Sequence, residues 1–139
     1  MTKTVVLDSF ALVSLFHKEP GWEKMREILY ELSSSKQKAL LNIINWGEFY
    51  YIIKRKVEKQ RAEEALVLLK QLPIELVPVD ETFVKEAATI KSEYPISYAD
   101  AFCVATANRY KGQILTHDPE FRAVEHLTSV TWLSTESGS

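Results

Sequence analysis

Four acidic residues of this chain stand at positions where a carboxylate could take part in phosphoryl chemistry. Asp8 and Asp118 each follow a short apolar run, and Asp100 lies in the first turn of a predicted helix. Glu48 lies in a helical stretch that is otherwise apolar on nearly all sides, where a carboxylate needs a partner. Carboxylates gather at one place only when a cation lies between them or when some of them are protonated.

Oxygen ligands without a thiolate or clustered histidines suit hard cations, so Mg2+ or Mn2+ is the expected ion. Such a cation activates a water for attack on a phosphodiester or phosphomonoester. Ser9, Ser97 and Thr116 stand beside the acids, and we expect their hydroxyls to hold the carboxylates in place. Taken singly, Asp100 is also explained as part of a capping box opened by Ser97, and Asp118 as a helix N-cap.

The elements that would position these residues alternate between strands and helices. Short apolar or β-branched runs predict five strands, at residues 4–7, 39–43, 74–79, 114–116 and 130–133. Helical periodicity, caps and breaks predict the intervening helices, at residues 9–17, 22–32, 45–57, 62–72 and 80–93, then one from Ser97 that Gly112 ends, and a helical turn after Pro119.

This alternation predicts a parallel sheet covered by helices on both faces, a three-layer α/β/α sandwich. Ligands of such sheets bind at the carboxyl ends of the strands, where the crossovers diverge. Asp8 and Asp118 follow strands, whereas Glu48 and Asp100 lie near the starts of helices at that same edge. We therefore expect the four acids to converge.

The composition is that of a globular protein with one domain. The chain has 139 residues, 46% of them hydrophobic and 26% charged, and we expect one domain over residues 1–133 with a flexible tail at 134–139. A single cysteine and an N-terminus without room for a signal peptide favour the cytoplasm. No apolar run is long enough for a membrane span.

The net charge of −2 gives no overall preference for nucleic acid, but a basic cluster stands out. It contains Lys54, Arg55, Lys56, Lys59 and Arg61. Lysines and arginines also suit the end of a helix that faces solvent. Near an anionic polymer, Lys54, Arg55 and Lys56 would instead bind the backbone phosphates of RNA.

Four segments together resemble the PIN domain, and most closely the small VapC-type toxins of prokaryotic toxin–antitoxin pairs. The segments follow the family's order over almost the whole chain: VLDSFAL at 6–12, NWGEFY at 45–50, SYADA at 97–101 and LTHDPEF at 115–121. The chain departs from the family pattern at Asn45, where many relatives carry Ser or Thr, and at His117, where Arg, Asn or Lys is frequent. We interpret His117 as an exposed residue without a role, although it is within reach of a substrate phosphate.

The resemblance implies a parallel-sheet α/β/α fold and an Mg2+- or Mn2+-dependent ribonuclease. It implies that Asp8, Glu48, Asp100 and Asp118 are the catalytic, metal-binding carboxylates, with Glu48 able to act through a water. It also implies a cognate antitoxin and a homodimer. A surplus of large apolar residues on the early helices agrees with an interface, although we expect about half of them in the core: Trp22, Met25, Leu29, Trp46, Phe49, Tyr50 and Ile53.

Two alternatives to a toxin remain open at this point. One is a PIN-like nuclease that acts in RNA processing without an antitoxin. The other is a metal-dependent phosphatase of small molecules on a similar sheet. That class generally needs a second acid beside the first strand's aspartate, and residues 9–11 supply none.

Overall fold

The computed structural model describes residues 4–133. Its strands are β1 (Val5–Leu7), β2 (Ala39–Asn42), β3 (Ile74–Val77), β4 (Gln113–Thr116) and β5 (Ser129–Trp132). Its helices are α1 (Ser9–His17), α2 (Trp22–Ser34), α3 (Ile43–Lys56), α4 (Lys59–Leu69), α5 (Glu81–Glu93), α6 (Tyr98–Tyr110) and the 3-10 helix η1 (Pro119–Val124). The predicted tail, residues 134–139, lies outside the described residues.

The five strands form one parallel sheet in the order β3-β2-β1-β4-β5. The chain moves outward from β1 to β2 and β3, then crosses over to β4 and β5 on the other side. The crossovers therefore diverge between β1 and β4, and ligands of open parallel sheets bind beside the carboxyl ends of such strands.

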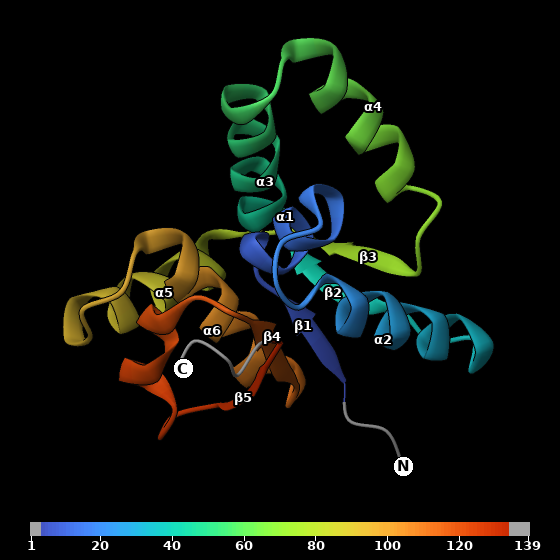
Figure 1. Cartoon of the computed structure of the whole chain (residues 1–139). Helices are drawn as coiled ribbons and strands as arrows, with labels where there is room; N and C mark the ends of the chain where they lie inside the picture. The colour runs from blue at the N-terminus through green and yellow to red at the C-terminus, as the bar shows by residue number, and fades with distance from the viewer. Residues whose placement is uncertain (1–3, 134–139) are drawn as a thin grey trace.

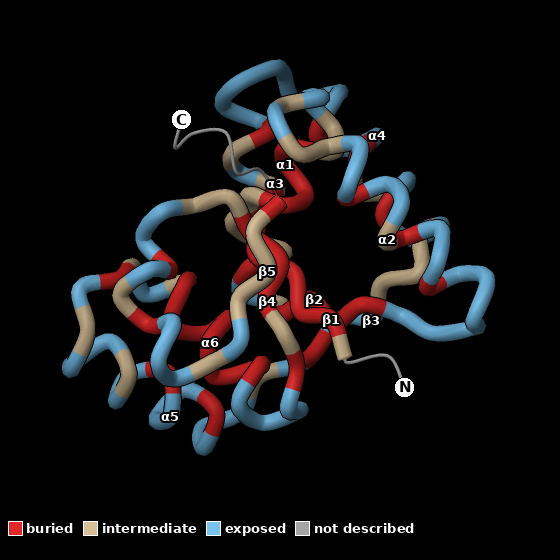
Figure 2. The backbone as a smooth tube through the Cα atoms, turned by 60° about the horizontal axis from the view of Figure 1, so that its bottom comes forward, coloured by how far each residue is buried: buried red, intermediate tan, exposed pale blue. Residues whose placement is uncertain are grey.

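Helices cover both faces of the sheet, as predicted (Figure 1). Alternate strand residues face opposite layers: Val5 and Leu7 pack with α1 to α4, whereas Val6 packs with α5 and α6. In Figure 2 the buried colour is concentrated on β1, β2, β4, α1 and α6. The prediction of a three-layer sandwich is confirmed.

About half of the large apolar residues on the early helices lie in the core, as expected. Met25, Leu29, Phe49 and Ile53 are buried in the core. Trp22, Trp46 and Tyr50 are half-buried. No helix within residues 4–133 is long and apolar enough to cross a bilayer.

Several element boundaries differ from the prediction. The helix expected at 62–72 is α4, and it begins and ends three residues earlier, because the chain leaves the helix in a turn at Lys70 before Pro73 is reached. The helix expected from Asn45 begins at Ile43, because Asn42 caps it and accepts a hydrogen bond from Ile44 N at 2.8 Å.

Gly112 has a different role from the one predicted. The residue that ends α6 in the left-handed conformation is Lys111, with φ of 54°. Gly112 is instead required by space, because a Cβ there would lie 2.9 Å from the carbonyl oxygen of Thr4 and 3.0 Å from Val6 Cγ2. The absence of a side chain lets the start of β4 approach β1.

Two glycine substitutions test this packing, and their expected effects have opposite signs. Gly112→Ala should lower the free energy of unfolding by about 1–3 kcal/mol, because the backbone of β1 would have to shift. Gly47→Ala, in the middle of α3 with open space around the new methyl group, should raise it by about 0.5–1 kcal/mol. Denaturant unfolding of both variants measures the difference, and a Gly112→Ala variant as stable as wild type would contradict the close approach.

Candidate metal centre

Asp8 lies directly after β1 and is completely buried. It is the N-cap of α1, since its Oδ1 accepts a hydrogen bond from Ala11 N at 2.9 Å. Its Oδ2 accepts from Thr116 Oγ1 at 2.8 Å. Burial raises the pKa of Asp8 to about 7, because the ionised form loses its hydration there.

Asp118 lies after β4, and Thr116 connects it to Asp8. The Thr116 hydroxyl donates to Asp8 and also accepts a hydrogen bond from Asp118 N at 2.9 Å. Asp118 Oδ1 accepts from Glu120 N at 3.0 Å, so this residue is the N-cap of η1. One threonine side chain thus fixes the two acids that follow the two central strands.

Asp100 reaches the same place from the first turn of α6, with only 2% of its surface exposed. Ser97 is the N-cap of α6 and accepts a hydrogen bond from Asp100 N at 3.1 Å. The predicted capping box is only half correct, however, because Glu120 Oε1 accepts from Ser97 N, also at 3.1 Å. Glu120 takes the capping role expected of the Asp100 carboxylate, which instead faces the other acids.

The side chains of Asp8, Asp100 and Asp118 converge. Each offers one carboxylate oxygen, and these three atoms lie within 4.8 Å of one another. Burial is the main reason why the pKa values of Asp100 and Asp118 are raised, and the neighbouring carboxylates raise the pKa of Asp100 further. We call these three residues the acid cluster.

Glu48 lies beside the acid cluster without joining it. Its carboxylate accepts a hydrogen bond from Ser9 Oγ, and burial raises its pKa while that bond opposes the change. The charges of Asp118 and Glu48 raise the pKa of Asp8 further, and the charge of Asp118 also raises the pKa of Glu48. All four predicted acids and the three predicted hydroxyl residues therefore lie at one edge of the sheet.

Two further residues of this site were missed in the sequence. Glu120 shares a hydrogen bond with Asp100 that raises the pKa of Asp100 and lowers that of Glu120. Asn45, noted in the sequence only as a departure from the family pattern, is completely buried, and its Nδ2 donates to the Ala99 carbonyl at 3.0 Å, which ties α3 to α6. Its Oδ1 has no hydrogen-bond partner among the described residues. The one signal for Glu120 was its position two residues after Asp118.

The acid cluster fits a hard divalent cation. Its donor atoms are carboxylate oxygens, which Mg2+ and Mn2+ prefer. The cluster is largely shielded from water, so its members repel one another with little screening when ionised. A cation between them would remove that repulsion.

The basic cluster is divided by the structure. Lys54 Nζ lies over the ring of Tyr50 at 5.6 Å, and the Arg55 guanidinium lies over Tyr51 at 5.3 Å. Lys56 Nζ instead lies 3.7 Å from Glu19 Oε2. Of the three residues predicted to bind RNA, Lys56 is the one that contacts Glu19, which also lies near His117 in the segment after β4.

His117 differs from the exposed residue that was expected. It is half-buried and meets the ring of Phe10 edge to face, with centroids 6.0 Å apart. Its Nε2 lies 3.9 Å from Glu19 Oε1. The residue therefore belongs to the rim of the site, next to Asp118.

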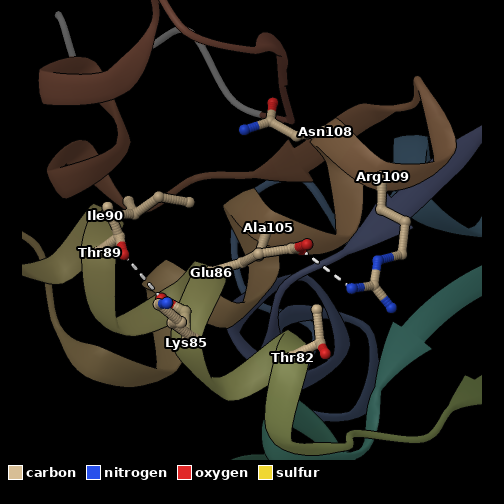
Figure 3. Close-up of a pocket in the computed structure, with 8 residues that line it drawn as sticks. All are labelled: Thr82, Lys85, Glu86, Thr89, Ile90, Ala105, Asn108 and Arg109. Atoms are coloured by element: carbon tan, nitrogen blue, oxygen red, sulfur yellow. Dashed lines mark hydrogen bonds and ion pairs between the residues drawn. The ribbon is translucent and has the colours of Figure 1, made fainter.

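A separate hollow of about 540 Å³ lies between α5 and α6 (Figure 3). None of the four acids lines it. Across it, Arg109 and Glu86 form an ion pair at 3.0 Å. This hollow is distinct from the acid cluster, and we assign it no part in the chemistry.

The raised pKa values predict how stability depends on pH in the presence of a chelator. A carboxyl group whose pKa is raised on folding stabilises the folded state at low pH, and this contribution is lost as pH rises through the raised value. For Asp8 the loss extends from about pH 4 to about pH 7, and amounts to about 4 kcal/mol at most. The isosteric variant Asp8→Asn should therefore melt several degrees above wild type at pH 8, and close to it at pH 4.

The matched control is Asp80→Asn. Asp80 is an exposed N-cap of α5 whose Oδ1 accepts from Phe83 N at 2.9 Å. Asparagine is an equally good N-cap, so this variant should melt like wild type at both pH values. If Asp8→Asn behaves in the same way, Asp8 is a helix cap only and its carboxylate is not destabilising.

Comparison with known proteins gives one family match and several solved structures. The PIN domain model matches residues 5–127, whereas no curated protein sequence matches the chain. VapBC2 from Rickettsia felis, bound to a promoter DNA fragment, is 13% identical with a TM-score of 0.74, covering 93% of this chain and 98% of the other. DNA-bound VapBC from Salmonella typhimurium is 15% identical with a TM-score of 0.74, covering 95% and 99%.

A third structure is VapC20 from Mycobacterium tuberculosis, described as a toxin that cleaves the sarcin–ricin loop. It is 15% identical with a TM-score of 0.71, covering 87% of this chain and 95% of the other. At these identities the likeness concerns the fold, and it confirms that the fold is the one seen in VapC-type toxins. Because the family match covers most of the chain, the predicted resemblance is confirmed, and the chain belongs to the PIN domain family.

Proposed function

We propose that the protein is an endoribonuclease that depends on Mg2+ or Mn2+ and hydrolyses phosphodiester bonds of single-stranded RNA. The observation that carries this proposal is the convergence of Asp8, Asp100 and Asp118 within 4.8 Å at the carboxyl edge of the sheet. Family membership supports a nuclease. The description of VapC20 as a toxin that cleaves the sarcin–ricin loop supports RNA as the substrate.

Each residue of the site has a distinct part in this proposal. Asp8, Asp100 and Asp118 would hold the cation, which supplies Lewis-acid stabilisation of charge on the phosphoryl group. Thr116 keeps Asp8 and Asp118 in register through its two hydrogen bonds. Ser97 and Glu120 fix the start of α6, and with it the position of Asp100.

Glu48 would orient the attacking water. Its carboxylate is held by Ser9 and lies near Asp8 and Asp118, at the margin of the acid cluster. In hydrolysis the water oxygen bonds to phosphorus, the bond from phosphorus to the leaving ribose oxygen breaks, and that oxygen takes up a proton. A half-buried carboxylate with a raised pKa is suited to accept the water's proton, since its affinity for a proton is closer to neutral pH.

We also propose that this single domain acts as a homodimer and pairs with an antitoxin protein. Structures of similar fold support an antitoxin partner. Two of them are VapBC structures, and another, from Klebsiella pneumoniae, is described as a toxin–antitoxin complex. A groove of about 290 Å³ between α1, α3 and α4, lined in part by Phe16, Ile53 and Leu68, offers apolar surface to a partner. Val67 and Leu68 on α4 are 60% and 48% exposed.

A cleavage assay tests the catalytic proposal. Labelled single-stranded RNA should be cut with Mg2+ or Mn2+ and left intact with excess chelator. Asp100→Asn should lower the rate by at least about a hundredfold, in keeping with the loss of a group that holds the catalytic ion. Asp80→Asn, purified identically, should cut like wild type and controls for a contaminating ribonuclease. Cleavage that persists both with chelator and in Asp100→Asn would remove the acid cluster from the reaction.

Light scattering tests the dimer. At micromolar concentration, the mass should be about twice the 16.0 kDa of one chain, because large apolar residues on α4 remain exposed in the monomer. A single species with the mass of one chain over the whole concentration range would contradict the proposal. The catalytic assignment would be unaffected by that result.

A further inference from the structure

Glu19 joins two basic side chains that come from separate parts of the chain. It follows α1, after Lys18 in the left-handed conformation, and its backbone N–H donates to Ser14 O at 2.9 Å. Its Oε2 lies 3.7 Å from Lys56 Nζ at the end of α3. Its Oε1 lies 3.9 Å from Nε2 of His117, in the segment after β4.

These contacts are too long to be strong hydrogen bonds, and one of them leaves a buried atom without a partner. His117 Nε2 is shielded from solvent and has no hydrogen-bond partner among the described residues. A hydrogen bond from a ring nitrogen requires an acceptor at about 2.7–3.2 Å. The imidazole meets the Phe10 ring edge to face, and its Nε2 lies beside an acceptor that it does not reach.

Lys56 and His117, the two basic residues beside Glu19, lie on the segments that carry Glu48 and Asp118. His117 is adjacent in sequence to Asp118, and Lys56 lies two turns beyond Glu48 on α3. Of the basic cluster, Lys54 and Arg55 are stacked on tyrosine rings. Lys56 and His117 therefore lie on two segments that also carry residues of the site, with the Glu19 carboxylate between them.

We propose that Lys56 and His117 form a binding site for a backbone phosphate of the RNA, and that Glu19 occupies this site in the free protein. This inference rests on the proposed function. A carboxylate between a lysine and an imidazole accepts from the same donors as a phosphate diester, which carries one full negative charge. Glu19 is 29% exposed on its side chain and Lys56 is 49% exposed, so their pairing is weak enough to be displaced.

Displacement of Glu19 would do two things for substrate binding. It would free the Lys56 ammonium group, and it would open one side of His117 Nε2. The acid cluster repels an approaching phosphate, and a local basic pair offsets that repulsion at the phosphate next to the reacting one. Glu19 is thus an internal competitor of the RNA rather than a residue that only ties α1 to α3.

Binding of labelled single-stranded RNA, measured by fluorescence anisotropy with chelator so that no cleavage occurs, tests this inference. Glu19→Gln should tighten binding by about threefold to tenfold at low salt, and less as salt is raised. The slope of log K against log salt should steepen, because in the wild type salt also weakens the competing ion pair between Glu19 and Lys56. Glu23→Gln, an exposed acid on α2 with the same change of charge, should change binding less than twofold.

A double-variant cycle separates a local contact from a general change of charge. Lys56→Gln should weaken binding, and Glu19→Gln should bring no gain when it is combined with Lys56→Gln. If Glu19→Gln binds RNA no more tightly than Glu23→Gln, the inference is overturned while the proposed function stands. If wild type and every variant fail to bind RNA, the phosphate site is overturned, and the proposed function is decided by the cleavage assay with Mg2+ or Mn2+.

A measurement on the wild-type protein makes the test independent of how the variants fold. The ring resonances of His117 can be assigned by their loss in His117→Gln and followed by NMR as a short oligoribonucleotide is added. Saturable shifts at His117, larger than those at His17 and His126, are expected. Shifts of the same size at all three histidines, or none at His117, would overturn the phosphate site.

Discussion

The burial and mutual repulsion of three neighbouring carboxylates, two of them buried and one half-buried, is the constraint on which the rest of this structure depends. Asp8, Asp100 and Asp118 offer oxygens within 4.8 Å of one another, in surroundings that raise the pKa of each. Such an arrangement lowers the stability of the ion-free protein, and proteins retain this kind of cost at functional sites. The surrounding sheet and helices supply the stability that allows the acids to remain together.

The fold brings the acids together with ordinary helix capping. Asp8 and Asp118 each cap a helix with one oxygen, and Ser97 caps the helix that carries Asp100. Capping fixes the direction of each side chain while another carboxylate oxygen remains available to the cluster. A role in capping and a role in holding a cation are therefore compatible for Asp8 and Asp118, because one carboxylate has two oxygens.

Local patterns predicted most of this arrangement, and contacts between distant residues account for what was missed. The strand ends at Asp8 and Asp118 and the cap at Ser97 are visible in short segments, so the parallel sheet and the meeting of the acids followed from them. Glu120 caps a helix that begins 22 residues earlier, and Gly112 is required by the approach of β1. Neither contact leaves a local pattern. The contact between Lys56 and Glu19 likewise joins residues that only the folded chain brings together.

Titration with Mn2+ followed by electron paramagnetic resonance tests the central claim most directly, because the signal of free Mn2+ disappears on binding. The wild-type protein at neutral pH should bind Mn2+ saturably, and Mg2+ should compete for the same site. Asp8→Asn, Asp100→Asn and Asp118→Asn should each weaken this binding by at least about tenfold, whereas Asp80→Asn should leave it unchanged. Equal binding by wild type and all three cluster variants would contradict a cation site formed by these carboxylates.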